Sequence, residues 1–206
     1  MGTSAIILAG GLSKRFGQNK GLALLAGKPL VKYVVDAVRN LVDEVIIVVN
    51  SETQVENFKI LRNIQVIVDE LDLQGPLIGA LTGFKATKSE YALLLPCDAP
   101  FASKDVLSLL LDLCIGVNAV IPRWPNGYIE PLHAAYRVEA ASSAAEAALR
   151  EGRVDMKSMI ERLRRVRYIS TLVLSQLDPD LRFFFNVNTP LDLKKAERML
   201  QKSKRP

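Results

Sequence analysis

Short apolar segments alternate along the chain with longer segments in which apolar residues recur at helical spacing. Short, mostly apolar segments of five or six residues indicate buried strands, and they occur at Ala5–Ala9, Glu44–Val49, Ile64–Val68, Tyr91–Leu95 and Val117–Pro122. The periodic segments between them predict helices over Val31–Leu41, Gln54–Leu61 and Pro76–Lys88, and one that begins after Ser103. The first half of the chain therefore has the order β-α-β-α-β-α-β-α-β.

This alternation predicts the fold class. Apolar strands joined by helices form a parallel sheet that is covered on both faces, and the crossovers are right-handed. We expect an α/β protein, a Rossmann-like three-layer α/β/α sandwich with a mostly parallel sheet. No linker rich in Pro, Ser or Gly divides the 206 residues, so we expect a single domain over 1–206.

The second half of the chain is less regular, especially around 123–135 and 151–188. Helices are predicted over Arg137–Arg150 and Asp155–Leu163, and a final helix is capped by Thr189 with Pro190 at its first position. Val166–Ile169 and Leu172–Leu174 are expected to be extended.

Composition excludes several classes of protein. A chain with 49% hydrophobic and 24% charged residues is globular rather than disordered. The apolar runs fall well short of the roughly 18 residues that span a membrane, and the first residues do not form a signal peptide. Two cysteines, Cys97 and Cys114, are too few for a disulfide scaffold and favour a reducing compartment. We expect a cytoplasmic protein without a membrane partner.

The net charge of +5 raises the question of a polyanionic partner. Basic residues concentrate at 162–167 and 202–206, but only 6% of residues are aromatic and no basic–aromatic stacking pattern is present. We interpret the two clusters as solvated surface and predict no nucleic-acid partner.

Candidate chemistry follows the first strand. In an open parallel sheet, ligands bind where the strands end, and here Gly10-Gly11 is followed by Lys14, Arg15 and Lys20. Glycines let consecutive N–H groups approach a phosphate, and the cations add positive charge. Neither G-x-G-x-x-G nor a P-loop motif is present. The alternative is an ordinary glycine turn with solvated cations.

Two carboxylates follow later strands. Asp69 ends a strand shortly before Gly75-Pro76, and it could accept two N–H bonds from the edge of a guanine. Asp98 stands between Pro96 and Pro100, where a single carboxylate suits Mg²⁺ shared with phosphate oxygens. A solvated or turn-capping aspartate is the alternative for each.

The remaining polar candidates carry weaker signals. His133 is the only histidine, and we interpret it as a packing or substrate-contact residue rather than a base. Cys97 has no metal-ligand set around it and is interpreted as packed. Asn186 and Asn188 alternate, so they share one face of an extended segment and could orient a phosphate or a metal-bound water.

Together these motifs resemble the molybdenum cofactor guanylyltransferase family, within the nucleotidyltransferase superfamily. The points of resemblance are L-A-G-G at 8–11, R-F-G at 15–17, K-G-L at 20–22, G-K-P-L at 27–30, Val-Asp at 68–69, G-P-L-I-G at 75–79, P-C-D-A-P at 96–100 and N-V-N-T-P at 186–190. They span nearly the whole chain. One departure is Glu130-Pro131-Leu132, where family members often carry His-Pro or Gln-Pro-Leu.

The resemblance implies a fold of the nucleotide-diphospho-sugar transferase type and a set of site residues. The implied GTP-binding residues are Leu8, Ala9, Gly10, Gly11, Arg15, Lys20, Asn50, Asp69 and Asp98. Lys20 and Asp98 would be catalytic, with Asp98 holding Mg²⁺. Asn186 and Asn188 would lie near the metal or the pterin phosphate.

The implied reaction is attack by the terminal phosphate of molybdopterin on the α-phosphorus of GTP, with loss of pyrophosphate. Its partners would be GTP, molybdopterin and, downstream, apo-molybdoenzymes or cofactor chaperones. Two alternatives stay open: a cytidylyltransferase or guanylyltransferase of the same fold with another acceptor, and a module that binds nucleotide or cofactor without turnover. Gly10-Gly11 favours guanine, because the cytidylyl group typically has L-A-A-G.

Overall fold

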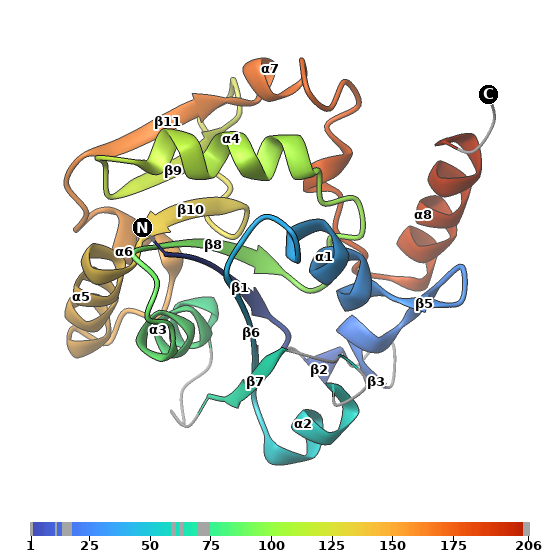
Figure 1. Ribbon diagram of the computed structural model, residues 1–206, viewed down its shortest axis with the longest axis horizontal. Coiled ribbons are helices and arrows are strands. Elements are labelled where there is room, and N and C mark those ends of the chain that lie inside the picture. Colours follow the sequence, from blue (N-terminus) through green and yellow to red (C-terminus); the bar gives the residue numbers. More distant parts are fainter. Residues whose placement is uncertain are drawn as a thin grey trace.

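A mixed sheet forms the centre of the computed structural model, which describes residues 2–10, 12–13, 18–58, 61, 64–69 and 75–203 (Figure 1). Within the described ranges seven strands pair in the order β11-β9-β10-β8-β1-β6-β7. Their bounds are β1 (Thr3–Leu8), β6 (Glu44–Val49), β7 (Gln65–Val68), β8 (Tyr91–Pro96), β9 (Ala119–Arg123), β10 (Ala134–Arg137) and β11 (Val166–Ser170). Two short hairpins lie outside this sheet: β2 (Leu12–Ser13) with β3 (Gln18–Asn19), and β4 (Leu24–Leu25) with β5 (Lys28–Pro29).

The strands that precede the candidate site residues run in one direction. β1 pairs in parallel with β6 and with β8, and Leu8 lies opposite both Val48 and Pro96. β6 pairs in parallel with β7. The carboxyl ends of these four strands therefore meet at one edge of the sheet, as the sequence predicted.

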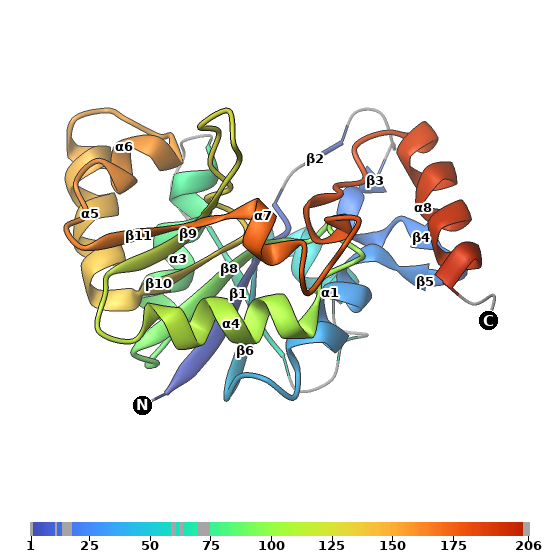
Figure 2. The same ribbon diagram turned by 90° about the horizontal axis from the view of Figure 1, so that it is seen from above.

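Helices cover both faces of the sheet (Figure 2). Their bounds are α1 (Leu30–Val38), α2 (Glu52–Phe58), α3 (Pro76–Ala86), α4 (Lys104–Cys114), α5 (Val138–Arg150), α6 (Met156–Ile160), α7 (Thr171–Leu174) and α8 (Pro190–Ser203), with short 3₁₀ helices η1 (Lys20–Leu22) and η2 (Arg182–Phe184). α1 and α4 pack on one face, while α3, α5 and α6 pack on the other. The three-layer sandwich expected from the sequence is confirmed.

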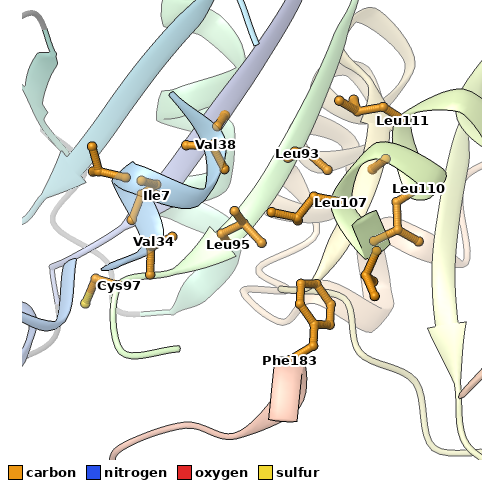
Figure 3. Packing of buried hydrophobic residues seen from close by; sticks show 14 of the residues in the cluster. Ile7, Val34, Val38, Leu93, Leu95, Cys97, Leu107, Leu110, Leu111 and Phe183 are labelled. Carbon is orange, nitrogen blue, oxygen red and sulfur yellow. The ribbon is translucent and has the colours of Figure 1, made fainter. Parts of the chain in front are cut away.

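The first core layer joins α1 and α4 to the sheet (Figure 3). Val34 and Val38 of α1 and Leu107 of α4 are fully buried against it, as their helical spacing predicts. Phe183 reaches from η2 toward α4 and is 1% exposed, so the segment around 183 is anchored in this core. Cys97 and Cys114 are free and buried in the same layer, which confirms that they are packing residues.

The second core layer brings α3 very close to β1. A Cβ added at Gly83 would lie 2.3 Å from Cγ2 of Ile6, which is fully buried, whereas one at Gly79 would lie 3.3 Å from Cδ2 of Leu8. Only the first contact is an outright clash. Glycine at position 83 therefore sets how closely the helix can approach the sheet.

Replacing Gly83 by alanine should destabilise the fold by about 1–3 kcal/mol, because the core must shift to admit the methyl group. Helix propensity favours alanine by about 1 kcal/mol at both glycines, so Gly79→Ala is the matched control and should cost less or stabilise. Urea denaturation of the two variants measures the difference. Equal stability of the two variants would contradict the steric explanation.

The structure adds one strand that was not predicted and corrects one prediction for the second half of the chain. Ala134–Arg137 is a strand, β10, which inserts antiparallel between β8 and β9. Leu172–Leu174 is helical rather than extended, because the Ser170 side chain caps α7 by accepting a hydrogen bond from the N–H of Leu172 at 3.2 Å. Along the described part of the chain, no helix is long and apolar enough to cross a membrane.

Candidate nucleotide-binding site

A lysine, an aspartate and an asparagine meet at the carboxyl edge of the sheet. The Lys20 ammonium forms an ion pair with the Asp98 carboxylate and donates a hydrogen bond to Oδ1 of Asn188 at 2.5 Å. Asp98 is 7% exposed, so the pair is largely removed from water. The structure thus unites three residues that the sequence predicted as functional, two of them separated by 168 positions.

Backbone hydrogen bonds fix the position of Asp98. The N–H of Cys97 donates to the carbonyl of Leu8 at 3.1 Å, which continues the pairing of β8 with β1. The N–H of Val187 donates to the carbonyl of Asp98 at 2.9 Å. This second bond joins the Asn186–Asn188 segment to the aspartate and explains how Asn188 reaches Lys20.

Asn19 holds the Lys20 turn against β1. Its side-chain amide donates to the carbonyl of Ala9 at 2.9 Å, and its Oδ1 accepts from the N–H of Gly21 at 2.9 Å. A Cβ at Gly21 would lie 3.1 Å from Sγ of Cys97, so the turn packs closely on the strand. Asn19 was not identified from the sequence. The available signal was its residue type, because an asparagine side chain can hydrogen-bond the backbone of the turn that follows it.

Gly10 and Asn50 touch at the ends of β1 and β6. A Cβ at Gly10 would lie 1.6 Å from Oδ1 of Asn50, so any other residue would displace the asparagine. The N–H of Asn50 donates to Oε1 of Gln54 at 2.8 Å, which ties it to the start of α2. The absence of a side chain at Gly10 is therefore what lets Asn50 lie against this backbone. Gly11 and Arg15 lie outside the described residues.

Asp69 lies at the end of β7 and is held by α3. Its N–H donates to the carbonyl of Val49 at 2.7 Å, and Thr82 donates through Oγ1 to its Oδ1 at 3.0 Å. The hydroxyl fixes the orientation of a carboxylate that the sequence placed at a base-reading position. Thr82 was not identified from sequence, because its link to Asp69 exists only once α3 packs against the sheet.

Asn186 does not join the lysine and aspartate. Its Oδ1 is buried and has no hydrogen-bond partner among the described residues. The two asparagines therefore differ in the structure: Asn188 contacts Lys20, and Asn186 does not. The shared role that their alternation suggested stays a prediction for Asn186.

The residues present fit a metal that is shared with a substrate. No group of three or more His, Cys, Asp or Glu side chains that could hold a metal occurs within the described ranges. Among the described residues, Asp98 is the carboxylate that forms an ion pair with Lys20. Mg²⁺ is commonly held by one or two carboxylates plus substrate phosphates, and a single carboxylate suits that mode.

His133 is a buried neutral side chain. It is 2% exposed, and burial lowers the pKa of its imidazole to about 3. A base this weak is a poor proton acceptor near neutral pH. This low pKa agrees with the prediction that His133 is not the catalytic base. Burial likewise raises the pKa of the Cys97 thiol, which disfavours a thiolate nucleophile at that position.

The stability of the fold should fall in acid partly because of His133. An imidazole with a folded pKa of about 3 and an unfolded pKa of about 6.5 is neutral in the native state and protonates on unfolding as the pH drops below about 6.5. As the pH falls from about 7 to about 5.5, this protonation lowers the free energy of unfolding by about 1 kcal/mol. Urea titrations of His133→Leu should show a pH dependence flatter by that amount; identical slopes would contradict the assignment.

Comparison with known proteins places the chain among nucleotidyltransferases. Residues 5–166 match the model of the MobA-like NTP transferase domain. A molybdenum cofactor guanylyltransferase of Desulfosudis oleivorans is 34% identical over 200 residues, covering 96% of this chain and 96% of the relative. A probable molybdenum cofactor guanylyltransferase of Pyrococcus horikoshii is 36% identical over 196 residues, covering 92% and 96%.

Solved structures show the same fold. Molybdopterin-guanine dinucleotide biosynthesis protein A of Archaeoglobus fulgidus superposes with a TM-score of 0.83 at 29% identity, over 97% of this chain and 99% of that one. A 4-diphosphocytidyl-2C-methyl-D-erythritol synthase of Anaerococcus prevotii reaches a TM-score of 0.72 at 18% identity, over 97% and 96%. The second likeness concerns the fold alone.

Proposed function

Because the chain belongs to the MobA-like NTP transferase family, we propose that it is a molybdenum cofactor guanylyltransferase, which transfers GMP from GTP to molybdopterin and releases pyrophosphate. The chain is a nucleotidyltransferase by family. The observation that carries the proposal is the Lys20–Asp98–Asn188 contact at the carboxyl edge of the sheet, beside the Gly10 turn. It supplies a cation and a metal-binding carboxylate where the family resemblance places the phosphates.

The reaction needs alignment and charge neutralisation more than a base. An oxygen of the molybdopterin phosphate forms a bond to the α-phosphorus of GTP, and the bond from that phosphorus to the oxygen bridging to the β-phosphate breaks. Pyrophosphate leaves with the electron pair of the broken bond. A phosphate monoester is already anionic near neutral pH, so the lack of a basic imidazole at His133 is no obstacle.

Each residue of the site has a part in this proposal. The Lys20 ammonium stabilises negative charge as it develops on the oxygens of the transferred phosphoryl group. The Gly10 backbone lies close to the phosphates because no side chain intervenes. Asp69, oriented by Thr82, accepts N–H bonds from the guanine edge, and Asn50 contacts the nucleoside. Asn188 keeps Lys20 in place and, with Asn186, faces the acceptor phosphate.

Nucleotidyltransferases of this kind use a divalent cation, and we propose Mg²⁺ held by Asp98 for this chain. Bound there, the cation would supply Lewis-acid neutralisation of phosphate oxygens. Molybdopterin is the proposed acceptor, and apo-molybdoenzymes or cofactor chaperones are the proposed recipients of the product. The cytoplasmic location expected from the sequence stays a prediction.

The test is pyrophosphate release by the full chain with Mg²⁺ and molybdopterin, compared for GTP, CTP and ATP. Release with GTP alone would support the proposal. Release with CTP instead would keep the transferase and overturn the choice of base. Folded protein that releases pyrophosphate with none of them would favour another acceptor, or a module that binds without turnover.

A further inference from the structure

One group of polar and aromatic side chains at the same edge of the sheet has no role in the proposal so far. It consists of Trp124, Glu130 and His133 from the β9–β10 connection, packed against Phe184 of η2. β10 runs antiparallel to both β8 and β9, so β9 runs in the same direction as β8. The connection that leaves β9 therefore begins at the edge where Asp98 follows β8.

Glu130 is a half-buried carboxylate with a single described donor. Its Oε1 accepts a hydrogen bond from the indole N–H of Trp124 at 2.8 Å. Its Oε2 lies 3.9 Å from Nδ1 of His133, which is beyond hydrogen-bond distance, and none of the described residues donates to it. Burial raises the pKa of Glu130, as expected for a carboxylate that has lost water without gaining enough donors.

His133 lies behind this carboxylate and is also unsatisfied. Neither ring nitrogen has a hydrogen-bond partner within the described part of the chain, although His133 is only 2% exposed. Its ring packs edge-on against Phe183 and Phe184, with centroids 5.2 and 5.5 Å apart. A buried polar ring without partners is costly, so its retention here calls for an explanation.

Aromatic rings form the wall beside the carboxylate. The rings of Trp124 and Phe184 lie 5.4 Å apart at 58°, and both side chains are only partly buried. Trp124 is held by a tight turn in which its carbonyl accepts from Gly127 and its N–H donates to Tyr128. The wall is therefore a fixed aromatic surface that a flat ring could contact.

The position of this group relative to Lys20 suits a single small ligand. Phe184 and Asn188 are four positions apart in the sequence, which limits the distance between their Cα atoms to about 14 Å. Asn188 contacts Lys20 directly. A ligand with a ring at Trp124 and a phosphate at Lys20 can therefore bridge the two. Asp69 lies on the other side of β8, after β7, at the far edge of the sheet.

We propose that Glu130, with Trp124 and Phe184, is the subsite for the pterin ring of the acceptor, a 2-amino-4-oxopyrimidine fused to further rings. Two adjacent N–H donors on the edge of such a ring match the oxygens of one carboxylate, and its face stacks on the indole. This inference rests on the proposed function. It gives the two carboxylates on opposite sides of Lys20 the same chemical task, one for each ring of a dinucleotide product.

Guanine carries the same 2-amino-4-oxo edge, so the experiment must separate the two sources. In Glu130→Gln, the side-chain oxygen can still accept from Trp124, but an amide NH₂ replaces the oxygen that would meet the donors. We expect the KM for molybdopterin to rise by about ten- to a hundredfold, while the KM for GTP changes by less than about twofold. Glu146→Gln, an exposed glutamate paired with Lys85, is the matched control and should leave both constants unchanged.

A rise in the KM for GTP would assign the subsite to guanine and overturn the proposal, as would unchanged constants in folded Glu130→Gln. If the wild-type chain releases no pyrophosphate with any nucleotide, the proposed function fails. The following binding measurement still tests the subsite in that case.

Tryptophan fluorescence reports on this subsite alone, since Trp124 is the only tryptophan in the chain. A simple pterin without a phosphate, and then molybdopterin, should quench the emission, and saturating GTP should neither quench it nor displace the pterin. Free tryptophan in the same solutions corrects for absorption by the pterin. Quenching by GTP, or no quenching by either pterin, would overturn the proposal.

Discussion

Replacing Lys20 by methionine should lower kcat for pyrophosphate release by about a hundredfold or more, with a much smaller change in the KM for molybdopterin. Methionine keeps an unbranched apolar stem close to that of lysine but removes the charge that the proposal directs at the transferred phosphoryl group. Removal of one preorganised donor from an enzyme site typically costs that much because no water replaces it in the same geometry.

The control for Lys20→Met is Lys85→Met, which removes an exposed lysine of α3 that pairs with Glu146 of α5. The control should keep wild-type kcat and stability. Steady-state kinetics with GTP and molybdopterin measure both variants, and urea denaturation confirms that each is folded. Near-wild-type turnover in folded Lys20→Met would remove this lysine from the proposed mechanism.

Replacing Asp98 by asparagine should also lower kcat by about a hundredfold, and it should raise the concentration of Mg²⁺ needed for half-maximal rate. Asparagine preserves the size of the side chain, and the backbone hydrogen bond from Val187 to residue 98 does not depend on the carboxylate. The variant therefore loses the charge and keeps the local framework.

Stability distinguishes a structural from a functional role of Asp98. Loss of the carboxylate leaves the Lys20 ammonium, 16% exposed, without its ion-pair partner, which should destabilise Asp98→Asn. The double variant with Lys20→Met removes both charges and should regain stability. If it regained activity as well, the aspartate would act only by balancing the lysine; we expect activity to stay lost.

Much of the framework of the site was predictable because it depends on local rules. The apolar run of Ala5–Ala9 followed by Gly10 marks a buried strand that ends in a close turn, and the structure places β1 (Thr3–Leu8) there. The same reasoning placed Asp98 and Asp69 at strand ends. Strand direction and continuous hydrophobicity together determine which loops share an edge of the sheet.

One strand was missed and one segment was assigned wrongly where local preference is weak. Ala134–Arg137 is too short and rich in alanine to predict a strand, and it pairs with β8 and β9 through non-local hydrogen bonds. Leu172–Leu174 has the composition of a strand, but Ser170, immediately before α7, caps the segment and stabilises a helical turn.

The sequence by itself determined the three-layer α/β fold, the edge of the sheet at which we propose that ligands bind and most of the residue types that would serve there. These follow from hydrophobic periodicity and from the residues that end each strand. Only the tertiary structure decided which side chains meet. Asn188 reaches Lys20 across 168 positions, Asn19 secures that lysine, Thr82 orients Asp69, and Glu130 faces Trp124 beside a buried histidine. Such contacts depend on chain segments that approach one another only when the sheet and its helices have packed, and no local pattern encodes them.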